Sequence, residues 1–181
     1  MPPSDGEPLT QLKTIGFVYD TREDRIRAAV NGSGPDSWSC WITRRLSLAW
    51  LAKAGDFLVT TSPLAQRAAP EHRGDLATFE HDAAMAQTAR AMTPTPPEVI
   101  ETAPADTALL DKVTWTPRGE RYQFELVDNR GTNAVGALTR PELQRIMQML
   151  QEVVAKAGWA QPTPTQQSTV DQAAPPSPVR H

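Results

Sequence analysis

The sequence is poor in the residues that most often carry chemistry, with one cysteine and three histidines among 181 residues. A single cysteine cannot form an internal disulfide, so a scaffold held together by disulfides is excluded. Cys40 stands between Trp38 and Trp41 in an apolar stretch, which predicts a buried and unreactive thiol. Because His181 belongs to a polar C-terminal segment, only His72 and His81 remain as candidates for a metal or acid-base site.

Long hydrophobic runs and an excess of one charge are also lacking. No apolar run approaches the roughly 18 residues that a membrane-spanning helix needs, and Met1 to Glu7 has neither the basic nor the apolar stretch of a secretion signal. We therefore expect a cytoplasmic protein that does not enter a membrane. The formal net charge is −3, and no segment is strongly basic, so overall charge does not indicate a polyanion-binding protein.

Catalytic and metal-binding patterns are missing as well. Glu71-His72-Arg73 falls in a polar loop, and Glu80-His81-Asp82 falls on a predicted helix, where adjacent side chains do not converge on one ion. We expect these side chains to be solvated. Gly32-Ser33-Gly34 precedes a strand, whereas a phosphate-binding loop leads into a helix. We therefore predict no catalytic residue, no metal ligand and no cofactor, and hence no enzyme. A site assembled only in three dimensions is the alternative that the sequence leaves open.

A pattern of strands and helices is nevertheless clear, and it occurs twice. Alternating apolar residues predict three strands and then a capped helix in each half of the chain. In the second strand, for example, Ile26, Ala28 and Val30 are expected to face the core, and Arg25, Arg27 and Ala29 are expected to face water. The predicted strands cover residues 14–19, 25–30, 37–42, 110–116, 121–127 and 132–138, and the predicted helices cover 44–54 and 140–157. Ile42-Thr43-Arg44 and Leu138-Thr139-Arg140 stand at equivalent junctions, and Thr139 to Glu142 matches a capping box. The sequence therefore predicts an α+β fold of duplicated βββα units, which form antiparallel sheets with the helices packed on one face.

The sequence pattern also predicts that the chain has five parts. They are a flexible leader (1–12), a first unit with an additional helix (13–90), a proline-rich linker (91–107), a second unit (108–159) and a disordered tail (160–181). The additional helix is predicted to begin at Asp75, and its apolar stripe consists of Leu76, Phe79, Ala83 and Ala86. Residues 57–70 fit either a continued helix or an apolar loop.

One group of residues in the first half is a candidate binding surface. It combines arginines with tryptophans: Arg22, Arg25, Arg27, Trp38, Trp41, Arg44 and Arg45. Arginine and aromatic side chains interleaved on a sheet can bind single-stranded nucleic acid through phosphate contacts and base stacking. Duplicated sheet-plus-helix modules of this kind broadly resemble the Whirly and PUR nucleic-acid-binding folds, although those have four strands per unit and this chain has three. The alternative is a solvated face on which nearby carboxylates neutralise the arginines while the tryptophans belong to the core.

Some apolar surface would stay exposed in a single chain, and this indicates a different function, binding to a protein. The helix over 44–54 is apolar on nearly every side, and a joined sheet leaves two edge strands, so a partner subunit is one way to cover both. The alternative is that residues 57–70 and the additional helix complete the burial internally. We expect a non-enzymatic protein-interaction module, an accessory, adaptor or inhibitory protein that binds a protein partner or itself as an oligomer. The alternative function is nucleic-acid binding through the Arg/Trp surface.

Overall fold

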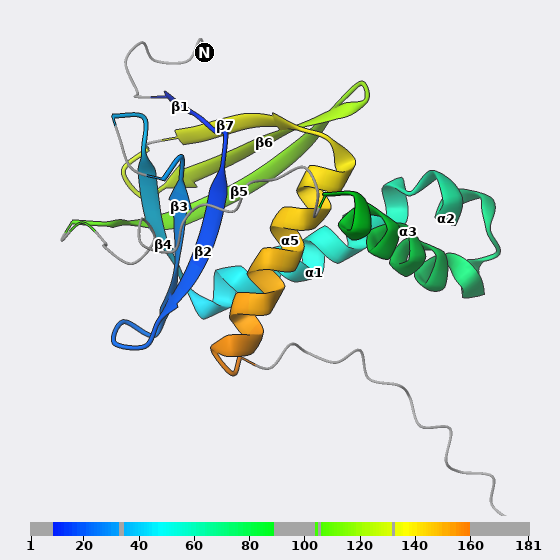
Figure 1. The fold of residues 1–181 in the computed structure, drawn as a ribbon, viewed down its shortest axis with the longest axis horizontal. Helices are drawn as coiled ribbons and strands as arrows, with labels where there is room; N and C mark the ends of the chain where they lie inside the picture. The colour runs from blue at the N-terminus through cyan, green and yellow to red at the C-terminus, as the bar shows by residue number, and fades with distance from the viewer. Residues whose placement is uncertain (1–8, 33–34, 89–103, 105, 132, 160–181) are drawn as a thin grey trace, which may run out of the picture.

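The computed structural model describes residues 9–32, 35–88, 104, 106–131 and 133–159, and it shows a mixed α/β fold around a seven-stranded sheet (Figure 1). The strands are β1 (Leu9–Gln11), β2 (Ile15–Asp20), β3 (Arg25–Val30), β4 (Trp38–Ile42), β5 (Ala108–Arg118), β6 (Arg121–Asp128) and β7 (Asn133–Leu138). The helices are α1 (Arg44–Thr61), α2 (Pro63–Arg67), α3 (Arg73–Thr88) and α5 (Arg140–Lys156), with a short 3₁₀ turn, η1, at Pro70–His72.

The order of the strands joins the two halves of the chain into one sheet. The order is β1-β7-β6-β5-β4-β3-β2, so β4 of the first half lies beside β5 of the second half. Most neighbours are antiparallel, as expected, but β4 pairs with β5 in parallel and β1 pairs with β7 in parallel. The sheet is therefore mixed, because the chain crosses over through α1, α2 and α3 before it returns to pair with β4.

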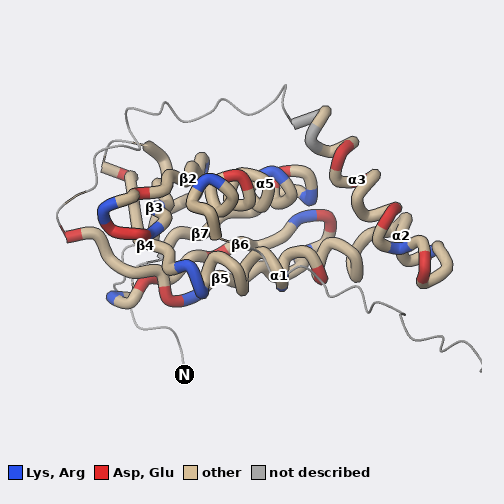
Figure 2. Tube along the Cα trace, turned by 90° about the horizontal axis from the view of Figure 1, so that it is seen from below, with Lys and Arg blue, Asp and Glu red and all other residues tan. Residues whose placement is uncertain are grey.

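The helices α1 and α5 cover the same face of this sheet (Figures 1 and 2). Trp50 of α1 contacts Phe17 of β2 and Phe124 of β6, with 5.8 Å between ring centroids in each pair. Tyr19 of β2 contacts Trp159, just after α5, at a centroid distance of 5.6 Å. Aromatic side chains from both halves therefore meet in one core between the sheet and the helices.

Alternation along the strands sets which residues enter that core. Ile26, Ala28 and Val30 of β3 are buried on the helix-covered side, as predicted. Cys40 of β4 is also fully buried, and burial raises the pKa of its thiol well above the usual value. The prediction of a buried cysteine is thereby confirmed.

Three boundaries differ from the sequence prediction. The first helix, predicted to end at residue 54 with Gly55 as its stop, continues to Thr61, because Leu58 extends its buried stripe and nothing crowds Gly55. Residues 63–67, left open by the sequence, form α2. The additional helix begins at Arg73, two residues before Asp75.

The expected leader also contains structure. Leu9–Gln11 pair with the edge of β7, and Leu12 is buried against Gly136, whose lack of a side chain leaves room for it. The predicted linker lies mostly outside the described residues, and the predicted tail lies entirely outside them. Among the helices of the described part of the chain, none combines the length and apolar content needed to cross a bilayer.

Candidate interaction surface

The seven residues of the predicted Arg/Trp surface do not form one patch in the structure. Arg22 and Arg25 are exposed near the turn between β2 and β3, and Arg44 and Arg45 are exposed at the start of α1. The two tryptophans lie three residues apart on β4, and side chains an odd number of positions apart point to opposite faces of a strand. Trp38 therefore enters the helix-covered core, while Trp41 lies on the other face.

Trp38 also has a polar partner inside the protein. Its indole Nε1–H donates to Oδ2 of Asp128 at 3.3 Å, and both residues are buried. This bond joins β4 of the first half to β6 of the second half. Trp38 thus has a core role, while Trp41 remains half-buried on the sheet face that no described helix covers.

Arg27 lies on that same helix-free face, yet it is only 3% exposed. Its neighbours across the two flanking strands are Val18 of β2 and Trp41 of β4. Burial lowers the pKa of the Arg27 guanidinium, and its Nε has no hydrogen-bond partner among the described residues. The expectation that the outward residues of β3 face water is therefore wrong at Arg27 and at Ala29, which is 5% exposed.

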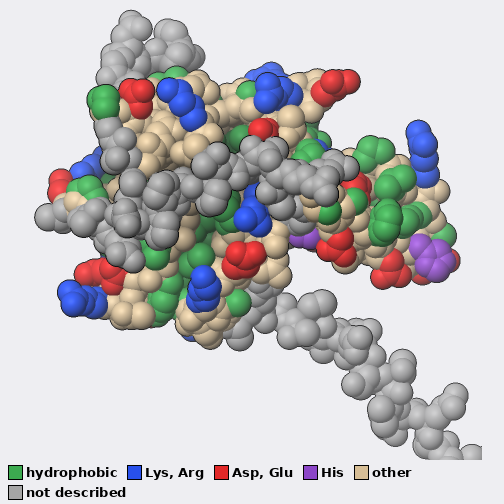
Figure 3. Space-filling view, viewed as in Figure 1, with side chains coloured by type: hydrophobic (Ala, Val, Ile, Leu, Met, Phe, Trp, Pro, Cys, Tyr) green, Lys and Arg blue, Asp and Glu red, His purple; other side chains and the backbone are tan. Residues whose placement is uncertain are grey.

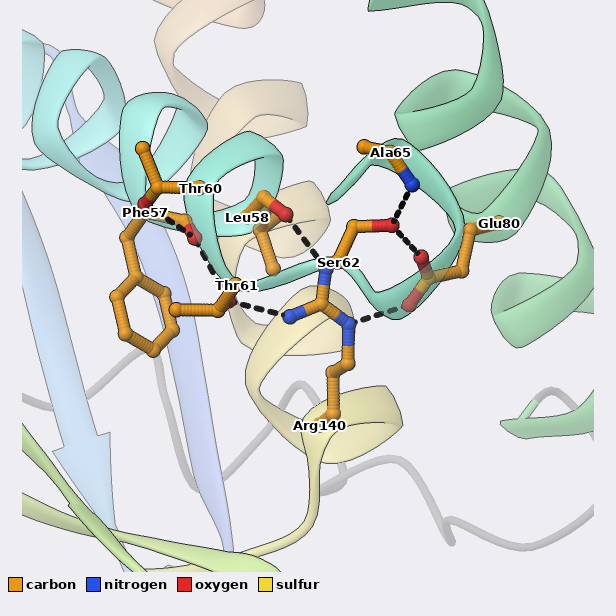
Figure 4. Close-up of polar contacts among 8 residues, drawn as sticks. All are labelled: Phe57, Leu58, Thr60, Thr61, Ser62, Ala65, Glu80 and Arg140. Atoms are coloured by element: carbon orange, nitrogen blue, oxygen red, sulfur yellow. Dashed lines mark hydrogen bonds and ion pairs between the residues drawn. The ribbon is translucent and has the colours of Figure 1, made fainter. Parts of the chain in front are cut away.

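A second cluster of polar side chains, which the sequence did not reveal, lies where three helices meet (Figure 4). Arg140, at the first position of α5, donates from Nε to a carboxylate oxygen of Glu80 on α3. Its Nη1 donates to Oγ1 of Thr61 at 2.6 Å and its Nη2 donates to the carbonyl oxygen of Leu58 at 2.6 Å, both in the last turns of α1. We call Arg140, Glu80, Thr61, Leu58 and Ser62 the Arg140 clamp.

Ser62 completes the Arg140 clamp. It is fully buried, it accepts from the amide of Ala65 as the N-cap of α2 at 3.0 Å, and it donates to the second carboxylate oxygen of Glu80. The Arg140 and Glu80 side chains are only 14% and 19% exposed. Glu80 is therefore not the solvated side chain expected from the sequence. Its contacts attach residues 62–88, which we call the α2–α3 arm, to the sheet-covering helices.

The attachment of α3 buries a different side from the one predicted. Ala77 and Ala84 are buried, whereas Phe79 is 66% exposed and Ala83 and Ala86 are exposed. At 100° per residue, Phe79 is about 160° around the helix from Ala77. The predicted stripe therefore faces largely outward, and hydrophobic side chains gather on the visible side of the arm (Figure 3).

Two carboxylates flank the exposed apolar residues. Asp75 and Asp82 are both exposed, and their spacing of seven residues places them on the same flank of the helix. We call Asp75, Phe79, Asp82, Ala83 and Ala86 the exposed α3 face. Apart from Phe79, the exposed large hydrophobic residues in the described part of the chain are Leu9 and Leu64, and Leu64 belongs to the same arm.

The first helix, expected to need a cover on every side, is partly covered from within. Its buried residues Ser47, Trp50, Ala54 and Leu58 form one stripe. Leu46, Leu48, Leu51 and Phe57 are partly buried against the core. The internal alternative therefore accounts for much of α1, and the unpartnered apolar surface lies on α3 instead.

The described residues contain no group of three potential metal ligands. A shallow pocket of about 150 Å³ lies between α1 and β5, and its lining contains no histidine: Leu46, Ala49, Trp50, Lys53, Asp111, Lys112, Val113 and Trp115. His72 is exposed on η1, and His81 lies half-buried on α3, away from this pocket.

In comparisons with known proteins, the chain matches no protein-family model, no curated protein and no solved structure.

Proposed function

We propose that the protein is a non-enzymatic interaction module, an accessory, adaptor or inhibitory protein that binds a protein partner or itself. The observation that supports this proposal is the outward position of Phe79, at 66% exposure, within an apolar stripe of a helix that is firmly attached on its other side. An exposed large aromatic residue beside small apolar ones is typical of a surface that a partner covers.

The Arg140 clamp strengthens this argument. Because Arg140 and Ser62 hold Glu80 from two directions, α3 is fixed against α5 and α2 before any partner arrives. A fixed surface loses little conformational entropy on binding, which favours affinity. The clamp is a positioning device in this account, and the exposed α3 face makes the contact.

The test compares what the wild-type chain and two surface variants retain during purification. Tagged wild-type protein, Phe79→Ser and Ala83→Asp are expressed at native levels, and bound components are quantified alongside the sedimentation mass of each chain. We expect a stoichiometric partner or a concentration-dependent oligomer for the wild type, reduced at least tenfold by either variant. A monomer that retains nothing at any concentration would exclude the proposal.

The sheet face without a described helix supports a second candidate function. Arg25 of β3, which is exposed, and Trp41 of β4, which is half-buried, share this face, while Arg27, the neighbour of Trp41 in register, is buried. In this second candidate function Trp41 stacks on a base of a single-stranded nucleic acid and Arg25 contacts a phosphate. The test is salt-dependent oligonucleotide binding that weakens in Arg25→Gln and Trp41→Ala; no binding at low salt rejects it.

We further propose that the two halves arose by duplication of one βββα unit. The proposal is supported by the recurrence of three strands and a helix in each half, and by threonine N-caps at Thr43 and Thr139. Strand β1 and helices α2 and α3 would then be additions. In this account the exposed α3 face belongs to an inserted element rather than to the repeated unit.

A further inference from the structure

We infer that the partner of the exposed α3 face is an amphipathic helix with basic residues beside its apolar stripe. This inference rests on the proposed function and specifies the chemistry of the partner. Three features of α3 support it: its convex shape, its small residues and its unbalanced charge.

The shape of the surface favours a helical partner. The exposed α3 face lies along a single helix of 16 residues, about 24 Å long. It offers no unpaired backbone groups, so an extended peptide could not add to it as a strand. Side chains of a second helix can instead interlock with the rows of side chains on α3.

The sizes of the residues favour close approach of that helix. Phe79 projects beside Ala83 and Ala86, so the exposed α3 face has one large side chain next to an area of small side chains. Helices with alanine at the contact approach near the short end of the usual 8–10 Å range between axes. A partner with leucine-sized residues over the alanines and a smaller residue over Phe79 would fill this relief.

The charges beside the apolar stripe of α3 indicate which charges the partner should carry. Asp75 and Asp82 are exposed on one side of the stripe. The only arginine or lysine of α3, Arg73, lies about 160° around the helix from Asp75 and donates from Nε to the carbonyl oxygen of Ala68. Lysine or arginine on the partner would pair with the two carboxylates at the rim of the contact, where such pairs mainly determine partner choice.

The same charge disfavours a second copy of this chain as the occupant. In a two-fold antiparallel pair of α3 helices, equal flanks meet, so Asp82 of each copy would approach Asp82 of the other. Like charges at short distance oppose such pairing. An anionic membrane surface would be repelled by the same flank.

The experiment uses three synthetic helical peptides of about 18 residues, five helical turns. They share one apolar stripe of leucine and alanine and differ only in their flanks, which carry lysine, glutamine or glutamate. Binding of each labelled peptide to the full chain is measured by fluorescence anisotropy at low and at physiological ionic strength.

We expect the lysine-flanked peptide to bind about tenfold more tightly than the glutamine-flanked one, a difference of about 1.4 kcal/mol, and the glutamate-flanked one to bind least. Asp82→Lys leaves one carboxylate and one ammonium group on this flank and should therefore abolish this order, and Asp75→Asn should reduce the preference without adding a cation to the first turn of α3. Asp111→Lys, at an exposed site on β5, is the matched control and should leave the order unchanged. Phe79→Ser should weaken all three peptides.

Equal binding of the lysine and glutamine peptides, or an order that Asp82→Lys does not change, would overturn the inference and leave the apolar docking surface standing. Binding of none of the peptides would also overturn it. The proposed function fails separately, when the wild-type chain neither oligomerises nor retains a partner. Circular dichroism and the melting temperature of each variant establish that the comparison is made between folded proteins.

Discussion

Arg140, at the first position of α5, donates from its guanidinium to the carboxylate of Glu80, 60 residues earlier in the chain on α3. The side chains of both residues are largely buried. Thr61, which accepts from Arg140, also has a partner of its own, because its hydroxyl group donates to the carbonyl oxygen of Phe57 at 2.7 Å. A charge at this depth is tolerated when it is paired and hydrogen-bonded. The pair therefore fixes where the α2–α3 arm lies relative to the sheet.

Replacing Arg140 by methionine should lower the free energy of unfolding by about 2–4 kcal/mol, because it leaves the Glu80 carboxylate enclosed without its cation. Chemical denaturation measures this loss. Arg118→Ala is the control, since Arg118 is exposed and makes one long hydrogen bond of 3.4 Å to Gln123; it should change stability by less than about 0.5 kcal/mol. Equal losses in the two variants would contradict a structural role for the clamp.

Asn31 predicts a contrast between two substitutions. Its φ of 59° lies in the left-handed region, and its side chain holds four backbone groups: the amides of Lys13 and Thr14 and the carbonyl oxygens of Gln11 and Asp36. Asn31→Ala loses the hydrogen bonds and strains the backbone, whereas Asn31→Gly loses only the hydrogen bonds. The left-handed conformation costs about 1–2 kcal/mol for a residue with a Cβ, and the greater freedom of glycine in the unfolded chain offsets part of this difference. We expect the alanine variant to be less stable than the glycine variant by about 1 kcal/mol, measured by thermal unfolding. An alanine variant as stable as the glycine variant would mean that this backbone conformation costs nothing.

The two threonine N-caps should differ in their contributions. Thr139 takes part in a full capping box with Glu142, whose carboxylate accepts from the Thr139 amide at 2.7 Å. Thr43 only accepts from the amide of Leu46, at 3.2 Å. Removing an N-cap side chain lowers the free energy of unfolding by about 1 kcal/mol, and we expect this loss for Thr43→Ala. Thr139→Ala should lose more, because the Glu142 carboxylate would also lose the hydrogen bond that Oγ1 of Thr139 donates to it. Equal unfolding free energies for the two variants would show that the box adds nothing.

Asp20 predicts a pH dependence of stability. The amides of Glu23 and Arg22 donate to its carboxylate and hold the pKa below the usual value. A lowered pKa in the folded state contributes stability that is present above the unfolded pKa of roughly 3.9 and is lost as the pH falls through the folded value. The melting temperature of Asp20→Ala should therefore lie below that of the wild type at neutral pH, and the two should converge in acid. A difference that stays constant into acid would contradict this assignment.

The sequence predicted most strands and the two long helices because their apolar periods are strong. Ile26, Ala28 and Val30 alternate without interruption, and α5 carries a stripe of seven buried residues below a capping box. Local patterns of this kind survive in any tertiary context that buries one face.

The exposed α3 face could not be predicted in the same way. On α3 the stripe with Phe79 looked like the buried side, yet the helix turns it outward because Glu80 must reach Arg140 and Ser62. A contact between residues 60 positions apart leaves no local signal in a single sequence. For the same reason Glu80 looked like a solvated charge beside His81.

The parallel pairing of β4 with β5 was hidden for a related reason. Only two residue pairs are in register there, Cys40 with Ala108 and Trp41 with Leu109. Whether so short a pairing forms depends on how the helices α1, α2 and α3, which connect β4 to β5, pack against the rest of the chain. Strand alternation did, however, contain the information that Trp38 and Trp41 face opposite sides, since they are three residues apart. Grouping them into one surface ignored that period.

The most direct test of the exposed α3 face as an interaction surface is site-specific photo-crosslinking in cells that express the chain. A photoreactive phenylalanine derivative replaces Phe79 in one protein and the exposed Arg118 of β5 in another. The account predicts a discrete crosslinked adduct from position 79 that disappears when Ala83→Asp is added, and no discrete adduct from position 118. An absence of adduct at position 79, or the same adduct from both positions, would contradict it.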